Sequence, residues 1–265
     1  PHRSTMAGRN SGNGRRPPLH EFLPAMVDRC GGLAPIAQSH THVEALLQDL
    51  GLPHERTGSA GHIQSLQVDL SWLGLYSGQI TGTRTTDLQQ ATQLFQRGLG
   101  AAATGDLTPQ QREILARRTA QTRRGADFVN QTQDWTGTRF RIPSGFVTQP
   151  EVWGDHNEHL TYRGQDVSRL RINIENYRFA RTASGWLSIL KARYADNGMR
   201  VMGSSSQGNY LGAVAYDPGA DRREYTLVAA QGQRSILLHI SLQEKSVSSM
   251  RPLIGEVISS FQPFH

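Results

Sequence analysis

The stretch IQSLQVDLSWLGLYSGQITG, residues 63–82, decides the fold of the middle of this chain. Its leucines and isoleucine recur at the three- and four-residue spacing that places side chains on one face of a helix: Ile63, Leu66, Leu70 and Leu73. Three glycines then interrupt the helical pattern: Gly74, Gly78 and Gly82. The pattern predicts an amphipathic helix followed by a tight loop that holds Tyr76 and Ile80.

Two further helices are predicted downstream of this loop. The second has an apolar stripe formed by Leu88, Ala91, Leu94 and Phe95. A loop from Gly98 to Gly105 ends it. The third begins after Asp106-Leu107, with Thr108 as the N-cap and Pro109 at the first helical position. The block therefore predicts three short helices around one small core.

This block resembles the peptidoglycan-binding family of three-helix modules found on bacterial wall hydrolases and envelope proteins. The residues that carry the resemblance, over about a fifth of the chain, are Leu66-Gln67, Leu70, Leu73 to Gly78, Gly82, Ala91, Phe95-Gln96 and Thr104 to Thr108. The sequence departs from the family pattern at Thr81, Thr85 and Leu88. The resemblance implies a ligand groove near the loop between the first two helices, formed by Tyr76, Gly78, Ile80, Gly82, Thr83 and Arg84. Arg84 and the threonines are chemically suited to the carboxylates of a stem peptide.

Composition narrows the class of protein. Hydrophobic residues make up 37% of the 265 residues, below the share usual in globular domains, so irregular sequence is expected. The net charge of +6, with arginine as nearly all of the basic residues, favours anionic partners without choosing among them. The single cysteine, Cys30, excludes an intrachain disulfide. No apolar run approaches the ~18 residues of a membrane helix, so no membrane span is expected.

The composition changes along the chain in a way that predicts five parts. Residues 1–18 are polar and arginine-rich and are expected to be a disordered tail; residues 19–57 form a short helical segment. The three-helix module occupies residues 61–117. Residues 118–133 contain arginines and few large apolar side chains, which is typical of a linker. Residues 134–265 form a second domain.

The second domain is predicted to be α+β, with an antiparallel sheet covered by helices. The segment Arg169 to Glu175 alternates apolar and polar residues as a half-buried strand does. Three further strand patterns are separated by two turn signals, which predicts a meander: Tyr210 to Tyr216, Tyr225 to Ala230 and Ser235 to Leu242. One helix is expected around Trp186 to Tyr194 and another around Met250 to Phe261. This domain weakly resembles the α/β/α fold of the PsbP family.

A search for catalytic groups finds weak candidates. His156 and His159 stand close to two carboxylates, and His239 is a conceivable third metal ligand, but the spacing is a poor zinc signature and an exposed turn is favoured. His239 lies in an apolar strand, where a structural role is favoured. Gly203 to Gly208 lacks the spacing of a nucleophile elbow and is expected to be a flexible turn. No nucleotide-binding motif occurs, and no metal or cofactor is expected.

These observations favour a non-catalytic protein of the bacterial cell envelope, periplasmic or secreted, whose export signal would lie upstream of residue 1. Its predicted ligand is peptidoglycan, through the stem peptide or the glycan, and the second domain is expected to bind another envelope protein. The alternative is a cell-wall hydrolase with its catalytic site in the second domain. Nucleic acid is not an expected partner because the arginines of the module, Arg84, Arg97 and Arg112, are dispersed.

Overall fold

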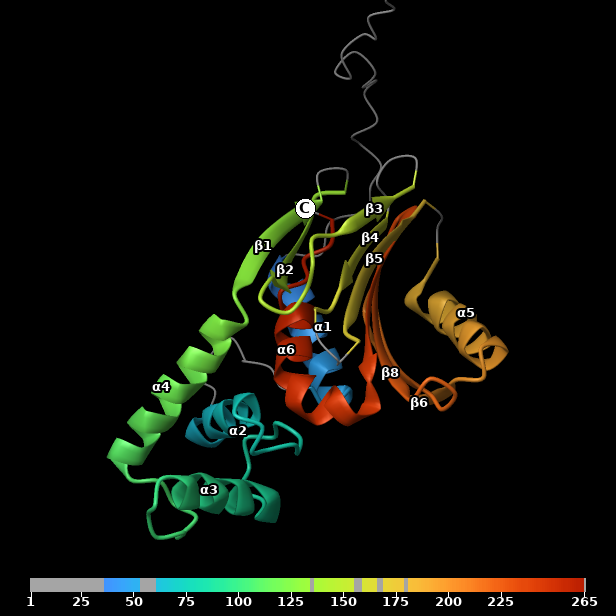
Figure 1. The fold of residues 1–265 in the computed structure, drawn as a ribbon. Coiled ribbons are helices and arrows are strands. Elements are labelled where there is room, and N and C mark those ends of the chain that lie inside the picture. Colours follow the sequence, from blue (N-terminus) through green and yellow to red (C-terminus); the bar gives the residue numbers. More distant parts are fainter. Residues whose placement is uncertain are drawn as a thin grey trace, which may run out of the picture. The chain divides into compact units, whose positions relative to one another are not determined.

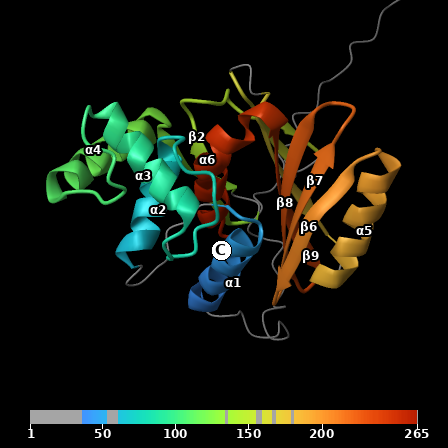
Figure 2. The same cartoon turned by 90° about the horizontal axis from the view of Figure 1, so that it is seen from below.

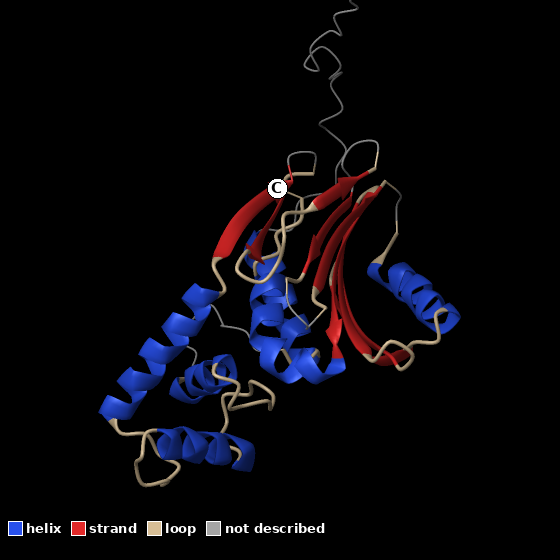
Figure 3. Cartoon of the chain, in the orientation of Figure 1, coloured by secondary structure: helices blue, strands red, loops and turns tan. Residues whose placement is uncertain are grey.

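The computed structural model of the chain describes residues 36–52, 61–133, 136–154, 159–165, 169–178 and 181–264. The helices are α1 (Ile36–Asp49), α2 (His62–Trp72), α3 (Thr86–Gly98), α4 (Pro109–Gly125), α5 (Ala183–Asp196) and α6 (Val247–Ser259). The strands are β1 (Phe128–Gln133), β2 (Thr138–Pro143), β3 (Glu151–Trp153), β4 (His159–Arg163), β5 (Arg171–Tyr177), β6 (Arg200–Gln207), β7 (Tyr210–Asp217), β8 (Arg222–Gln231) and β9 (Arg234–Gln243). Helices therefore precede a sheet with helices, which confirms the α+β prediction (Figure 3).

The helices α2, α3 and α4 surround a core of their own. Its buried members come from all three helices and from the loops between them: Val68, Leu70, Tyr76, Ile80, Leu88, Ala91, Phe95, Leu107 and Leu115. The Thr85 hydroxyl caps α3 by accepting from the backbone N–H of Leu88 at 3.2 Å. Thr108 caps α4 and Pro109 lies in its first turn, as predicted; Gln111 adds a reciprocal capping box with Thr108.

Residues 118–133, predicted as a linker, have regular structure. Helix α4 continues through the arginine run to Gly125, and β1 begins at Phe128. Arginine is a good helix former, so an arginine run with few apolar side chains can extend a capped helix as readily as it can form a linker. The run is also held by contacts: Arg123 pairs with Glu256 of α6 at 3.0 Å, and its guanidinium lies 5.5 Å from the Trp72 ring centroid.

A seven-stranded antiparallel sheet follows in the order β3-β4-β5-β9-β8-β7-β6, and β1 and β2 form a separate hairpin. The predicted meander is present as β7, β8 and β9. At the β7–β8 turn, a carboxylate oxygen of Asp217 accepts from the N–H groups of Gly219 and Ala220, each at 3.0 Å. Gly203 to Gln207, expected in a flexible turn, instead belong to edge strand β6, because pairing with β7 supplies a register that the Ser/Gly-rich sequence does not show.

Helices cover both faces of the sheet (Figures 1 and 2). Helix α5 packs on β6, β7 and β8, where Trp186, Leu190 and Tyr194 are buried. On the other face, α1 contacts β6 and β7, while α6 contacts β9 and β2. The α6 stripe is buried there as predicted, and α2 of the three-helix module also contacts α6. Residues 34–265 form one compact unit with separate cores.

Among the described helices, none combines the length and the apolar character needed to cross a membrane. The predicted tail, the first helical pattern of residues 19–57, Cys30 and His156 lie outside the described residues.

Candidate functional site

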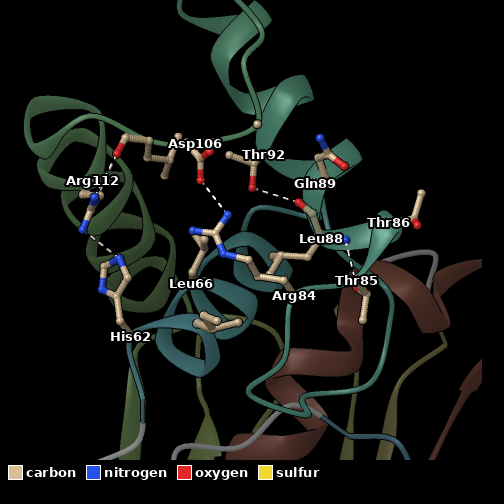
Figure 4. A pocket seen from close by; sticks show the side chains of 13 residues that line it. His62, Leu66, Arg84, Thr85, Thr86, Leu88, Gln89, Thr92, Asp106 and Arg112 are labelled. Carbon is tan, nitrogen blue, oxygen red and sulfur yellow. Dashed lines mark hydrogen bonds and ion pairs between the residues drawn. The ribbon is translucent and has the colours of Figure 1, made fainter.

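A cavity of about 400 Å³ opens in the three-helix module (Figure 4). The beginning of α2, the beginning of α3 and the loop between α3 and α4 enclose it. Its lining mixes charged, hydroxyl, amide and apolar groups: His62, Ile63, Leu66, Arg84, Thr85, Thr86, Leu88, Gln89, Thr92, Gly105, Asp106, Leu107 and Arg112. Such a mixture of polar and apolar groups around a cavity is typical of a site for a small ligand.

A buried glutamine of α2 fixes the loop on one side of this cavity. The Gln67 side chain is fully buried. Its amide oxygen accepts from the backbone N–H groups of Thr81 and Gly82, at 3.1 and 2.9 Å. Its amide nitrogen donates to the Tyr76 hydroxyl and to the backbone carbonyl of Thr83, each at 3.2 Å. One side chain therefore replaces the backbone pairing that a loop lacks.

A second buried glutamine fixes the opposite loop. Gln96 of α3 accepts from the Gly105 N–H at 2.9 Å and donates to the Asp106 carbonyl at 2.9 Å. Gly105 has φ of +86°, a left-handed conformation that favours glycine. Each of the two loops is thus fixed by the amide of one buried glutamine. Arg84 and Asp106, one at each loop, keep exposed side chains.

Arg84 and Asp106 meet between the two fixed loops. The Arg84 guanidinium donates to the Asp106 carboxylate at 2.6 Å, and both side chains are 70% exposed. An exposed pair of this kind contributes little to stability. At the other side of the cavity, Arg112 lies 2.8 Å from the His62 ring nitrogen and donates to the Leu107 carbonyl (Figure 4). The cavity therefore presents two cations, one carboxylate and an imidazole to solvent.

Of the six ligand-binding residues predicted from sequence, one lines the cavity and the others belong to the loop beside it. Tyr76 and Ile80 are buried in the module core, and the Tyr76 hydroxyl donates to the Gln79 carbonyl at 2.7 Å, so both act on the shape of the loop. Gly78 lies against the Tyr76 ring, and Gly82 has φ of +73°. Of the six, Arg84 alone is among the residues that line the cavity; Thr83 is exposed beside it.

Sequence reasoning did not find four of the polar groups in the cavity: His62, Gln89, Asp106 and Arg112. Asp106 stands 22 residues after Arg84 and belongs to the motif Thr104 to Thr108, but only the packing of the two loops brings these charges together.

The histidines named as metal candidates lie in different places. His159 is in β4, half-buried, with its ring stacked on Trp153 at 4.1 Å between centroids, in place of the expected exposed turn. His239 is buried in β9. Within the described residues, no group of three or more His, Cys, Asp or Glu side chains is arranged to hold a metal ion.

His239 is instead the centre of a buried charge cluster. Its ring nitrogens lie 3.7 Å from a Glu175 oxygen and 3.5 Å from a Glu224 oxygen, and Nδ1 lies 2.8 Å from the Thr226 hydroxyl. Burial alone would lower the pKa of His239, but the two carboxylates outweigh it and raise that pKa above 6.5. Burial alone would raise the pKa of Glu175, yet interaction with His239 lowers it to about 2.

These shifts predict how stability depends on pH. The raised pKa of His239 contributes stability that is complete below pH 6.5 and is lost as pH rises through the folded-state pKa. The lowered pKa of Glu175 contributes stability that is complete above pH 4.5 and is lost as pH falls towards 2. We expect the free energy of unfolding, measured with urea, to be highest between these limits. An unfolding free energy that rises steadily from pH 6 to 9 would contradict this assignment.

Comparisons with known proteins give a match for the module. Residues 59–115 match the family described as "Putative peptidoglycan binding domain". No curated protein matches the chain.

Two solved structures are similar to part of the chain at low identity. The solution structure of cyanobacterial PsbP (CyanoP) from Synechocystis sp. PCC 6803 is 15% identical, over 52% of this chain and 92% of that chain, with a TM-score of 0.40. A crystal structure from Bacteroides thetaiotaomicron VPI-5482 is 12% identical, over 48% of this chain and 44% of that chain, with a TM-score of 0.30. The resemblance of the module is confirmed, because residues 59–115 are similar to the peptidoglycan-binding family of three-helix modules.

Proposed function

We propose that this chain is a non-catalytic protein of the bacterial cell envelope, periplasmic or secreted. In this proposal, residues 61–117 are a domain that binds peptidoglycan, and residues 134–265 are a second domain that binds a further envelope partner. The observation that carries the proposal is the family match of residues 59–115, because the cavity lies within the matched segment.

The chemistry of the cavity supports a peptidoglycan ligand. Stem peptides carry both carboxylates and amines, and Arg84, Arg112 and Asp106 offer complementary charges to each. A ligand carboxylate can take the place of Asp106 on Arg84, since both side chains of that pair are mostly exposed and the pair costs little to open. The hydroxyls of Thr85 and Thr86 and the amide of Gln89 are suited to glycan hydroxyls or peptide groups.

The test is to incubate the purified chain with insoluble peptidoglycan sacculi, to sediment them, and to assay bound protein and released fragments. We expect binding without release. In the variant Arg84→Ala/Arg112→Ala, affinity should fall about 10-fold or more, since each hydrogen bond to a charged group makes a net contribution of about 1.5–3 kcal/mol.

The single variant Arg84→Ala is matched by Arg97→Ala, which also removes one positive charge, but from an exposed site of α3 that does not line the cavity. The affinity of Arg97→Ala should stay near that of the unmodified chain. Equal losses in Arg97→Ala and Arg84→Ala would mean that net charge, and not the cavity, drives sedimentation. Release of muropeptides would favour the alternative, a hydrolase.

A further inference from the structure

A second cavity, of about 220 Å³, lies in the sheet domain on the face that carries α5. We call it the arginine cavity; it is lined by Arg169, Arg171, Ala220, Arg222, Ser241 and Gln243. Strand register explains why these residues meet. Arg171 of β5 is opposite Ser241 of β9, and Arg222 of β8 is opposite Gln243 of β9. Alternation along the strands then points all four side chains to one face.

The arginine cavity has an excess of positive charge. The Arg222 guanidinium donates to the Asp217 carboxylate at 3.2 Å. Among the described residues, this is the one ion pair that a residue of the cavity makes. Within those residues, the guanidinium groups of Arg169 and Arg171 make no ion pair closer than 4 Å. Arg171 acts at longer range on Glu151, which is already paired with Arg163. Within the described part of the chain, the three arginine side chains of the cavity therefore make one ion pair, between Arg222 and Asp217.

Two buried polar atoms beside the cavity lack partners in the part of the chain that the structure describes: Arg222 Nε, a donor, and Gln243 Oε1, an acceptor. A buried polar atom left without a hydrogen bond costs about 1–3 kcal/mol. A ligand that satisfies both must accept a hydrogen bond from Arg222 Nε and donate one to Gln243 Oε1, and the three arginine side chains favour an anion in this role. A phosphate group that keeps one proton has both properties, whereas sulfate at neutral pH has no proton to donate.

We propose that the arginine cavity binds a phosphate group, as inorganic phosphate or as a phosphomonoester. Arg169, Arg171 and Arg222 supply the charge and the N–H groups, and planar guanidinium groups match the geometry of phosphate oxygens. Gln243 selects for a protonated or hydroxyl-bearing ligand. The proposal does not depend on peptidoglycan binding, because no residue of the cavity lies in residues 61–117.

The experiment is isothermal titration calorimetry of the full chain at neutral pH, which measures its affinity for inorganic phosphate, glycerol 3-phosphate and sulfate. We expect phosphate to bind at least about 10-fold more tightly than sulfate, because the buried Gln243 oxygen rejects an ion without a donor. Tighter binding of glycerol 3-phosphate than of phosphate would identify a phosphomonoester as the ligand, and the reverse would identify the free ion.

Variants separate the roles of the cavity residues. Arg171→Gln should weaken phosphate binding about 10-fold or more, whereas Arg139→Gln, at an exposed position of β2 outside the cavity, should not change it. Gln243→Leu should remove the preference for phosphate over sulfate. A general loss of stability would weaken the binding of both anions and leave the ratio of their affinities unchanged. The proposal would be overturned if none of the three anions gave a heat of binding. It would also be overturned if the unmodified chain bound phosphate and sulfate with equal affinity.

Discussion

Replacement of His239 by leucine is expected to destabilise the sheet domain by about 3–5 kcal/mol, the usual cost of removing one partner from a buried charge pair. The imidazole is 3% exposed and lies between the carboxylates of Glu175 and Glu224. Leucine has nearly the same volume, so cavity formation is a minor part of the effect. The main effect is that two buried carboxylates lose their cation. They must then either stay ionised, at a cost in desolvation free energy, or take up protons.

Urea unfolding at pH 5.5 measures this effect, with two comparison variants. The triple variant Glu175→Gln/Glu224→Gln/His239→Leu should recover most of the lost stability, because neutral amides no longer need the imidazolium. His159→Ala removes a half-buried histidine that stacks on Trp153, and should cost only about 1 kcal/mol. If His239→Leu and His159→Ala prove equally mild, the buried cluster does not hold a charged histidine.

The second large effect is expected for Gln67→Ala in the three-helix module. The substitution leaves the backbone N–H groups of Thr81 and Gly82 and the Tyr76 hydroxyl without the amide that they bind. At about 1 kcal/mol or more for each such group, the loss is about 2–4 kcal/mol. The loop that carries Arg84 then loses its support, so affinity for sacculi should fall even though Gln67 touches no ligand.

Amide hydrogen exchange at Thr81 and Gly82, together with thermal unfolding, measures this loss. Both amides should exchange much faster in Gln67→Ala than in the unmodified chain. The matched control is Gln90→Ala, which truncates an exposed glutamine of α3 and should change stability by no more than about 0.5 kcal/mol. Slow exchange that persists in Gln67→Ala would show that the loop holds its shape without this amide.

The elements that the sequence predicts well are those with a local signal. The leucine stripe of α2, the Thr108 cap of α4 and the alternation of β5 each depend on neighbours within a few residues. Strand β6 and the β1–β2 hairpin have no comparable pattern. Their hydrogen bonds depend on partners that only the tertiary fold supplies.

The candidate site was predictable only in part for a related reason. Arg84, Tyr76 and Ile80 were named because the resemblance to the peptidoglycan-binding family implies a groove at their loop; the burial of Tyr76 and Ile80 could not be foreseen from spacing. The two glutamines that fix the loops, Gln67 and Gln96, stand in the family motif, but nothing in their spacing predicts that they are buried while Gln89 and Gln90 are exposed. Whether a glutamine amide is buried depends on the residues that pack around it, and those residues lie far away along the chain.

Helix α4 gives the module a mechanical role that its contacts imply. Its 17 residues form a rod of roughly 25 Å that leads into β1 within three residues. Near its end, Arg123 is tied to Glu256 of α6, and Arg141 of β2 reaches the same carboxylate. A pull on α2 and α3 would therefore be carried along a stiff helix into the β1–β2 hairpin and, through Glu256, into α6.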